Sequence, residues 1–381
     1  MKALIISHPC ATATNQAVFA GVRRITGWDL QLVVPARWRD EFGNSLGQAD
    51  DPELEGRVIK VPVIFNGNII LHCYRMGWSS FLRRGNYDVI YMHHEPYALA
   101  TGQVCLANSR QRNPAAFGFY SAQNIFKTYP PPFSWVENFV HRSSRFCFPV
   151  SRTVADVLAA KKTRALCTVC PLPVDPAIYF PRDTGSGVQL KEANEVIIGY
   201  VGRLVESKGL ATLAAALARI PHLAWKLHVV GTGEFRGAFE QLLKEGNILD
   251  RVTFHGFIPH LKTPEYLSAM DLLVVPSETR PNWKEQFGRV IVEAMACGTP
   301  VLGSDSGEIP VLIQSGGGGI VFPEANAPAL AECLSRMIES PALRYELAER
   351  GRVWVSETAT LEVVARRMAG AMEQASRERK R

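Results

Sequence analysis

The chain has 381 residues, of which 47% are hydrophobic and 20% charged, a balance typical of folded globular proteins and not of disordered or collagen-like chains. One hydrophobic core rarely serves more than about 250 to 300 residues, so the length predicts two domains. The formal net charge of +6 suits small anionic ligands or an anionic membrane surface, and it is too weak to indicate nucleic acid as a partner.

The first half of the chain contains a series of short apolar runs. The opening run has a single lysine before it and is too short for a secretory signal, so we predict a first strand. Apolar runs bounded by turn residues and separated by amphipathic stretches indicate buried parallel strands with crossover connections. We therefore predict one Rossmann-like α/β domain over residues 1–180, with the strands ALIIS, LQLVVP, DVIYMH, AFGFY, RFCFPV and ALCTVCPL.

The interdomain linker is predicted in PLPVDPAIYFPRDTGSG, residues 171–187, because its prolines and glycines support neither a helix nor a central strand. A second series of runs follows, with helical segments between them at 209–219 and 234–245. This predicts a second doubly wound domain over residues 181–360, with the strands EVIIGYVGR, WKLHVVGTG, RVTFHGF, DLLVVPS, TPVLGSD and GGIVFP.

The C-terminal stretch from 327 to 376 is helical by pattern, and its last part carries Leu361, Val364, Met368 and Met372 at helical spacing. We expect residues 361–381 to form a helix and basic tail that packs back on the N-terminal domain. Because no apolar run approaches the roughly 20 residues of a membrane span, we expect a cytoplasmic protein. The basic tail suggests peripheral contact with the inner face of the membrane, and a solvated chain end is the alternative.

The eight cysteines are scattered through apolar segments, which favours reduced thiols buried in the core. Cys167 and Cys170 are closely spaced, but no second pair at zinc spacing accompanies them. The sequence therefore favours no metal site, and metal or redox chemistry at Cys167 and Cys170 is the alternative.

Ligands of open α/β sheets bind where the strands end and loops meet helix N-termini. In GYVGRLVESKGL, Arg203 and Lys208 lie in such a loop and would face a diphosphate; solvated loop cations are the alternative. In VVGTGEF, Gly231 and Gly233 would let the backbone approach a ligand, or would simply form a tight turn.

In KEQFGRVIVEAMACGTPV a helix is predicted to start near Gly288, so that Phe287, Gly288 and Arg289 present unpaired amides. Glu285 precedes this helix and Glu293 is predicted on the same face, since positions eight apart nearly superimpose. Carboxylates accept hydrogen bonds from vicinal hydroxyls, as in a ribose or a sugar. The alternative is a ladder of surface ion pairs between Glu285, Arg289 and Glu293.

Two strand ends of the first domain carry polar side chains: His93, His94 and Glu95 follow one, and Gln123 and Asn124 follow the other. A histidine there either hydrogen-bonds a sugar or satisfies a turn. We assign these residues to the acceptor side of the site. The neighbouring NIFKTYPPPFSW either contacts an acceptor or packs against the domain.

From Glu195 to about Gly351 the motifs already quoted occur in one order, with VTFHGF, DLLVVPS and DSGEIPVLI among them. Together they resemble the retaining glycosyltransferases of family 4, which have the GT-B fold: two Rossmann-like doubly wound parallel-sheet domains facing a central cleft. PLPVDPAIYFP resembles the interdomain segment of that family, and the first domain matches it only in broad pattern.

The resemblance implies that Arg203 and Lys208 neutralise the donor diphosphate, that Glu293 holds the ribose and that Glu285 holds the donor sugar. It implies no metal and no other cofactor, the nucleotide sugar being a co-substrate. Retention of configuration would follow from front-face attack, with the departing phosphate taking the acceptor proton. We predict the catalytic residues Arg203, Lys208, Glu285 and His94, and the donor-binding residues Gly202, Gly231, Gly233, Phe287, Gly288, Arg289 and Glu293.

The sequence departs from the family pattern in three places. SHPCATATNQ stands where the family has a glycine-rich loop after its first strand, and Gln286 stands where a small residue is common. The loop from Pro276 to Glu285 is longer than usual, and its Glu278 is a rival to Glu285.

The resemblance implies a metal-independent hexosyltransferase. Its donor would be a UDP- or GDP-sugar, and its acceptor a hydroxyl of a glycan or lipid-linked molecule in the biosynthesis of cell-surface polysaccharide or another glycoconjugate. The alternatives are a nucleotide-sugar epimerase on the same scaffold and a non-catalytic nucleotide-sugar-binding protein.

Overall fold

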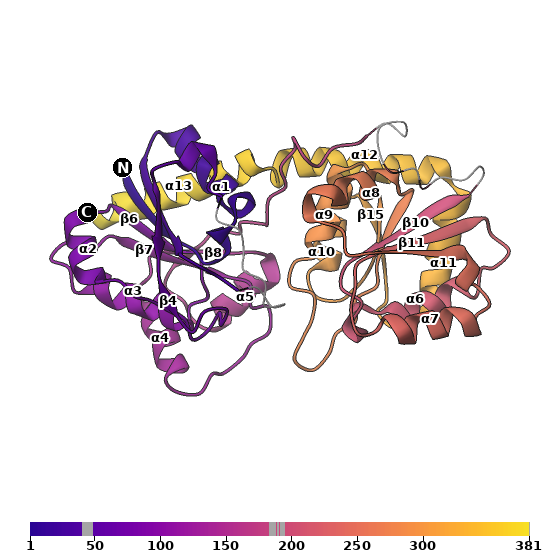
Figure 1. Cartoon of the computed structure of the whole chain (residues 1–381), viewed down its shortest axis with the longest axis horizontal. Helices are drawn as coiled ribbons and strands as arrows, with labels where there is room; N and C mark the ends of the chain where they lie inside the picture. Colours follow the sequence, from indigo (N-terminus) through magenta and orange to yellow (C-terminus); the bar gives the residue numbers. More distant parts are fainter. Residues whose placement is uncertain (40–48, 183–187, 189, 191–194, 381) are drawn as a thin grey trace. The chain divides into compact units, whose positions relative to one another are not determined.

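The computed structural model describes residues 1–39, 49–182, 188, 190 and 195–380 (Figure 1). The chain divides into two compact units. The first unit combines Met1–Pro171 with Leu361–Arg381, and the second is Leu172–Thr360. The predicted linker thus begins at the boundary of the units, and its residues 183–187 lie outside the described part of the chain.

Within its described residues the first unit is built on a seven-stranded parallel sheet of order β3-β2-β1-β6-β7-β8-β9. All six predicted strands form here. The added strand, β3, forms the edge of the sheet and buries only one of its four residues; it was not predicted from the sequence although VIKV is mostly apolar. The strands are β1 (Lys2–Ile6), β2 (Asp29–Pro35), β3 (Val58–Val61), β6 (Val89–Met92), β7 (Ala116–Ser121), β8 (Phe146–Pro149) and β9 (Leu166–Cys167), and β4 (Val63–Ile64) with β5 (Cys73–Tyr74) forms a separate antiparallel pair.

Helices cover both faces of this sheet (Figure 1). The C-terminal helix lies beside α1 on one face, and α2, α3 and α4 lie on the other. The helices of this unit are α1 (Ala13–Thr26), α2 (Trp78–Gly85), α3 (Leu99–Ser109), α4 (Phe133–Ser143), α5 (Arg152–Ala160) and α13 (Leu361–Lys380).

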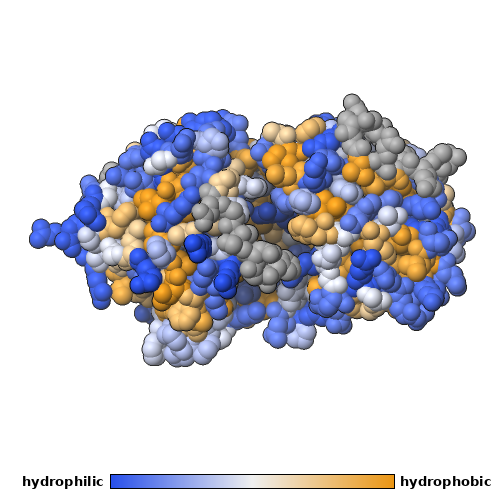
Figure 2. Space-filling model, in the orientation of Figure 1, coloured by the Kyte–Doolittle hydropathy of each residue, from blue (hydrophilic) through white to orange (hydrophobic). Residues whose placement is uncertain are grey.

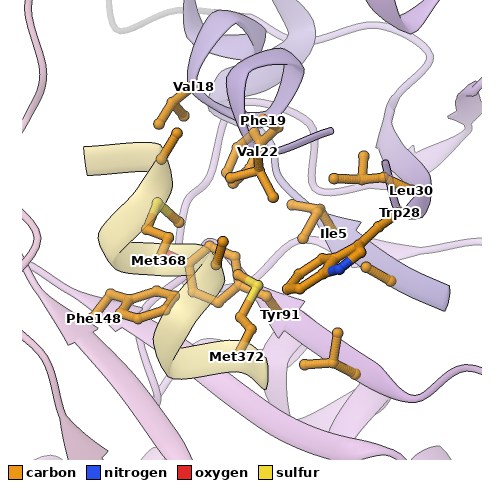
Figure 3. Packing of buried hydrophobic residues seen from close by; sticks show 14 of the residues in the cluster. Ile5, Val18, Phe19, Val22, Trp28, Leu30, Tyr91, Phe148, Met368 and Met372 are labelled. Atoms are coloured by element: carbon orange, nitrogen blue, oxygen red, sulfur yellow. The ribbon is translucent and has the colours of Figure 1, made fainter. Parts of the chain in front are cut away.

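Helix α13 completes the core of the first unit although about 190 residues separate it in sequence from β9. Met368 and Met372 point between Phe148, Tyr91 and the side chains of α1 (Figure 3). Met372 is fully buried and Met368 is 4% exposed, and burying one such side chain contributes about 1.5 to 3 kcal/mol. The helical spacing seen in the sequence therefore corresponds to a core-facing stripe.

The second unit has a six-stranded parallel sheet among its described residues, of order β12-β11-β10-β13-β14-β15. It contains the six predicted strands. They are β10 (Val196–Val201), β11 (Trp225–Val230), β12 (Val252–Gly256), β13 (Leu272–Val275), β14 (Val301–Ser304) and β15 (Gly319–Phe322).

Two layers of helices enclose this second sheet (Figure 1). Leucines of four of these helices, three from one layer and one from the other, join the strands in one core on one face, where Trp225 and Phe239 are fully buried. The helices of that face are α6 (Leu210–Leu217), α7 (Arg236–Glu245) and α11 (Ala327–Glu339), and those of the other are α8 (Thr263–Ala269), α9 (Arg289–Ala296), α10 (Ile309–Gly316) and α12 (Pro341–Thr358).

No helix in the described part of the chain is long and apolar enough to cross a membrane. On the face seen in Figure 2, hydrophilic side chains are interspersed with apolar ones over both units. All eight cysteines are free thiols. The Sγ of Cys167 lies 2.9 Å from the Sγ of Cys147 on the adjacent strand.

Candidate functional site

The strand order of the second unit reverses between β10 and β13, which are neighbours in the sheet although β11 and β12 lie between them in sequence. The loops that follow these two strands must diverge, and ligands of open α/β sheets bind at such a switch point. A cavity of about 210 Å³ lies there. Six of the predicted site residues line it: Gly202, Arg203, Lys208, Glu285, Gly288 and Arg289.

Lys208 and Glu285 form an ion pair across this cavity. The Nζ of Lys208 lies 2.5 Å from Oε2 of Glu285, and the Ser277 hydroxyl donates to the same oxygen at 3.0 Å. The Lys208 ammonium also lies 5.0 Å from the centre of the Trp283 ring. The cavity therefore holds a fixed cation and a fixed carboxylate side by side.

Glu285 is held in place through its backbone as well. Its carbonyl accepts a hydrogen bond from the Glu308 amide at 3.1 Å, and a Cβ on Gly307 would lie 2.1 Å from that oxygen. The rival carboxylate, Glu278, has other partners: the Thr212 hydroxyl at 2.6 Å and Arg280 at 3.1 Å. Of these two acids, Glu285 is the one that lines the cavity.

Helix α9 starts after Gly288, as predicted, and Gly288 adopts the left-handed conformation (φ 74°) that favours glycine. Phe287 is 4% exposed and packs inward. Glu293 is on α9 but is not among the residues that line the cavity. Its Oε1 lies 2.9 Å from Nε2 of His260, which is also 2.9 Å from the Tyr179 hydroxyl.

The two carboxylates therefore do not share one helical face. Glu285 precedes α9 in a loop and contacts Lys208, while Glu293 lies inside α9 and contacts His260. The eight-residue spacing placed them together only on the assumption that Glu285 is helical. In the structure the site has one carboxylate in the cavity and a second in a separate hydrogen-bonded chain.

Gly231 and Gly233 pack the loop after β11 against the loop that carries Arg203. A Cβ on Gly231 would lie 1.9 Å from the carbonyl oxygen of Gly202, and one on Gly233 would lie 2.2 Å from that of Leu204. Neither glycine lines the 210 Å³ cavity. In the structure, these two glycines therefore allow the two loops to approach each other closely.

The first unit has its own switch point, between β1 and β6. His93 follows β6, and its Nδ1 lies 3.1 Å from the Ser7 hydroxyl at the end of β1. Glu95 accepts from the Ser121 hydroxyl at 2.8 Å and from the Ala122 amide at 2.7 Å. Burial raises the pKa of Glu95 to about 7 against the opposing effect of these two hydrogen bonds.

His94 belongs to a cluster of rings at the same switch point. Its Nδ1 lies 3.0 Å from Nδ1 of His8, its Nε2 lies 3.3 Å from the Tyr74 hydroxyl, and its ring centre is 5.0 Å from that of His72. Burial, with the neighbouring imidazoles, lowers the pKa of His94 well below its ordinary value. His94 is therefore neutral near pH 7.

Gln123 and Asn124 follow β7, where Asn124 is 2% exposed. The Gln123 amide nitrogen lies 3.4 Å from the Tyr129 hydroxyl, and the Tyr129 ring stacks on Tyr97 at 4.2 Å. In the same segment Trp135 is 68% exposed. The segment NIFKTYPPPFSW therefore has a packed part and an exposed part.

A cavity of about 580 Å³ in the first unit lies elsewhere. Ile90 at the start of β6 and Ala115 just before β7 line it, so it opens at the amino ends of the strands. Since ligands of open α/β sheets bind at the carboxyl ends, we do not assign the donor or acceptor to it.

The sequence did not single out several residues that now contact the predicted ones. His8 lies two positions after the end of the first strand, a position that does signal a site residue. His72, Tyr74, Ser277 and His260 carry no such signal, because only the fold brings them to their partners.

Comparison with known proteins agrees with this architecture. HepE of Anabaena, whose structure was solved in complex with UDP, matches with a TM-score of 0.74 at 21% identity, over 98% of this chain and 100% of that chain. Its likeness establishes the fold. The chain thus has the GT-B fold of two Rossmann-like domains.

The family model for glycosyl transferases group 1 matches residues 182–354. The alpha-D-kanosaminyltransferase of Streptomyces kanamyceticus is 30% identical over 176 residues, 46% of this chain and 44% of that protein. The N-acetyl-alpha-D-glucosaminyl L-malate synthase of Bacillus anthracis is 32% identical over 190 residues, 48% of this chain and 47% of that protein. Both matches span less than half of these curated relatives, so the likeness to the glycosyl transferases group 1 is shown for residues 182–354 alone.

Proposed function

We propose that the chain is a glycosyltransferase that binds a nucleotide sugar in its second unit and transfers the sugar to a hydroxyl of a glycan or lipid-linked acceptor. The observation that supports this most strongly is the switch-point cavity lined by Arg203, Lys208 and Glu285, within the residues that match the family. UDP in the HepE structure supports a nucleoside diphosphate as the leaving group. The products would enter cell-surface polysaccharide or another glycoconjugate.

In the proposed reaction the bond between the sugar and the distal phosphate breaks, and the nucleoside diphosphate gains negative charge. Arg203 and Lys208 would stabilise that charge, since fixed cations lower a barrier where charge develops. In this role they replace a metal ion. The departing phosphate would accept the acceptor proton from the same side, which retains the configuration and needs no protein nucleophile.

The ion pair suggests how donor binding proceeds. Without a donor, Lys208 neutralises Glu285 at 2.5 Å. A diphosphate would compete for the ammonium and release the carboxylate oxygen to a sugar hydroxyl, while Ser277 continues to donate to it. Glu293 would hold the ribose, positioned by His260.

In the first unit, we propose that His93, His94, Glu95, Gln123 and Asn124 serve the acceptor side, with His94 taking part in catalysis. We place the reaction in the cytoplasm, at the inner face of the membrane. The membrane contact rests on the basic end of α13. Co-sedimentation with liposomes that does not depend on their anionic lipid content would remove that part of the proposal.

The function is tested by screening UDP-glucose, UDP-N-acetylglucosamine and GDP-mannose for thermal stabilisation. A donor at 100 times its Kd stabilises the fold by about 2.7 kcal/mol. The stabilising donor is then incubated with and without sugar acceptors. A transferase releases nucleoside diphosphate in an acceptor-dependent way, an epimerase changes the sugar with no acceptor, and a binding protein changes nothing.

A further inference from the structure

Three histidines from separate segments of the first unit meet at the switch point between β1 and β6. His8 follows β1, His94 follows β6, and His72 directly precedes β5. One ring nitrogen of each lies within 4.8 Å of those of the other two, and on one zinc ion these separations would close to roughly 3.3 to 3.4 Å. His72 and His94 are 0% and 1% exposed, so their nitrogens need partners inside the protein.

The hydrogen bonds of His72 fix its tautomer. Its Nδ1 lies 3.0 Å from the carbonyl oxygen of Asn68 and 3.1 Å from that of Ile69. Carbonyl oxygens only accept, so Nδ1 carries the proton and Nε2 carries the lone pair. That Nε2 is buried and has no hydrogen-bond partner among the described residues, and a buried acceptor without a partner is costly.

The other two histidines have the spacing of two ligands on one ion. Their Nδ1 atoms lie 3.0 Å apart. Two nitrogens bound tetrahedrally to zinc at about 2.0 to 2.1 Å are separated by roughly 3.3 to 3.4 Å, only slightly more than this. With both Nδ1 lone pairs on a metal, Nε2–H of His94 donates to the Tyr74 hydroxyl, 3.3 Å away.

Metal-bound histidines usually donate their second ring N–H to a fixed partner. The carbonyls of Asn68 and Ile69 supply that partner for His72, and Tyr74 supplies it for His94. The Trp38 ring lies 4.8 Å from that of His8 and 4.9 Å from that of His72, which makes one wall of the cluster apolar. Burial also lowers the pKa of all three histidines, and neutral imidazole is the form that binds metal.

We propose that His8, His72 and His94 bind one divalent transition-metal ion, such as Zn²⁺, through three imidazole nitrogens. Three imidazoles with an open fourth position suit zinc and the neighbouring late first-row metals. Mg²⁺ and Ca²⁺ require oxygen ligands instead. The site departs from the sequence prediction of no metal and does not depend on the transfer reaction. With both ring nitrogens of His94 occupied, it would give His94 a structural role in place of the catalytic one proposed above.

To test this, the untagged chain is stripped of metal by a chelator and then titrated with Zn²⁺ in a calorimeter. We expect one ion per chain, and Co²⁺ should give the visible absorption of a nitrogen-bound site of low coordination number. His72→Gln should weaken Zn²⁺ binding at least 100-fold. The matched control is His222→Gln, which removes an exposed histidine of the second unit and should bind like the wild type.

Circular dichroism shows whether His72→Gln is folded; if it is not, His8→Gln, at a partly buried position, replaces it. The Co²⁺ spectrum of the wild type needs no variant. A wild-type chain that binds no Zn²⁺ below about 10 μM would overturn the proposal, since structural sites bind far more tightly. Equal losses of Zn²⁺ affinity in the His72 and His222 variants, or no loss in either, would also overturn it. The cluster would then be a chain of hydrogen-bonded neutral histidines.

Discussion

The Nζ of Lys208 lies 2.5 Å from Oε2 of Glu285, and this ion pair joins the loop after β10 to the loop after β13. The two side chains are only 19% and 11% exposed. The cation proposed to bind the diphosphate and the acid proposed to bind the sugar thus neutralise each other in the structure. The ion pair should affect both the stability of the fold and the rate of the proposed transfer, and separate experiments measure the two.

The structural consequence is tested by a double-mutant cycle with Lys208→Met and Glu285→Gln. Each single change leaves the other group partly buried and without its main partner, so each should lower the free energy of unfolding by about 1 to 3 kcal/mol. The double variant should lose less than the sum, with a coupling of at least about 1 kcal/mol. Urea denaturation measures all four proteins, and additive losses would show that the pair is not coupled.

Glu293 is predicted to hold the ribose of the donor. Glu293→Gln should weaken binding of UDP or GDP, whichever binds the wild type, by about 1.5 to 3 kcal/mol, the value of hydrogen bonds to a charged group. The 2′,3′-dideoxy nucleotide should bind the variant and the wild type alike. Calorimetry with both nucleotides decides, because a purely structural role of the Glu293–His260 bond would weaken both equally.

His141 makes the first unit sensitive to acid. Burial, with the nearby Lys161 cation, lowers its pKa to about 4, and neither ring nitrogen has a hydrogen-bond partner among the described residues. The unfolded chain, with a pKa near 6.5, binds the proton more readily. The free energy of unfolding therefore keeps its full value above about pH 6.5 and decreases by up to about 3 kcal/mol as the pH falls toward 4.

His141→Leu should remove this loss, and His222→Leu, at an exposed site, should not. Urea midpoints between pH 4 and 7 give the two profiles. The raised pKa of Glu95, about 7, acts with the opposite sign in the same window, so the difference between variant and wild type is the informative quantity. Parallel profiles for wild type and His141→Leu would contradict the assignment.

Helix α13 is predicted to be part of the folding unit of the first domain. Met368→Ala and Met372→Ala each remove a buried side chain from that core (Figure 3) and should cost about 2 to 5 kcal/mol. Arg366→Ala on the same helix removes an exposed pair with Glu362 and should cost less than about 1 kcal/mol. Hydrogen exchange should become faster in β1 and β2 of the methionine variants, and an effect confined to α13 itself would argue against this role.

The sequence was sufficient for the elements with a strong local pattern. The strands β10 and β13, and the start of α9 after Gly288, all follow from apolar runs and turn residues. Because parallel strands end at one edge of the sheet, the loops with Arg203, Lys208 and Glu285 could be placed together. These three residues do line one cavity.

What depends on tertiary contacts was not predictable. The spacing of Glu285 and Glu293 implied one helical face, yet Glu285 is in a loop anchored by the turn at Gly307, which no local pattern shows. His260 reaches Glu293 across 33 positions of sequence. His72 and His94 likewise meet only because β5 and β6 bring distant segments to one place.

The central claim is that the cavity of the second unit binds the diphosphate of a nucleotide sugar through Arg203 and Lys208. The most direct test is the rate of acceptor-dependent release of nucleoside diphosphate by Arg203→Ala and Lys208→Ala, with the exposed Lys244→Ala as control. Each site variant should lose at least ~2 kcal/mol of transition-state stabilisation, roughly 30-fold in rate, while the control keeps the wild-type rate. Near-normal turnover in either folded site variant would contradict the account.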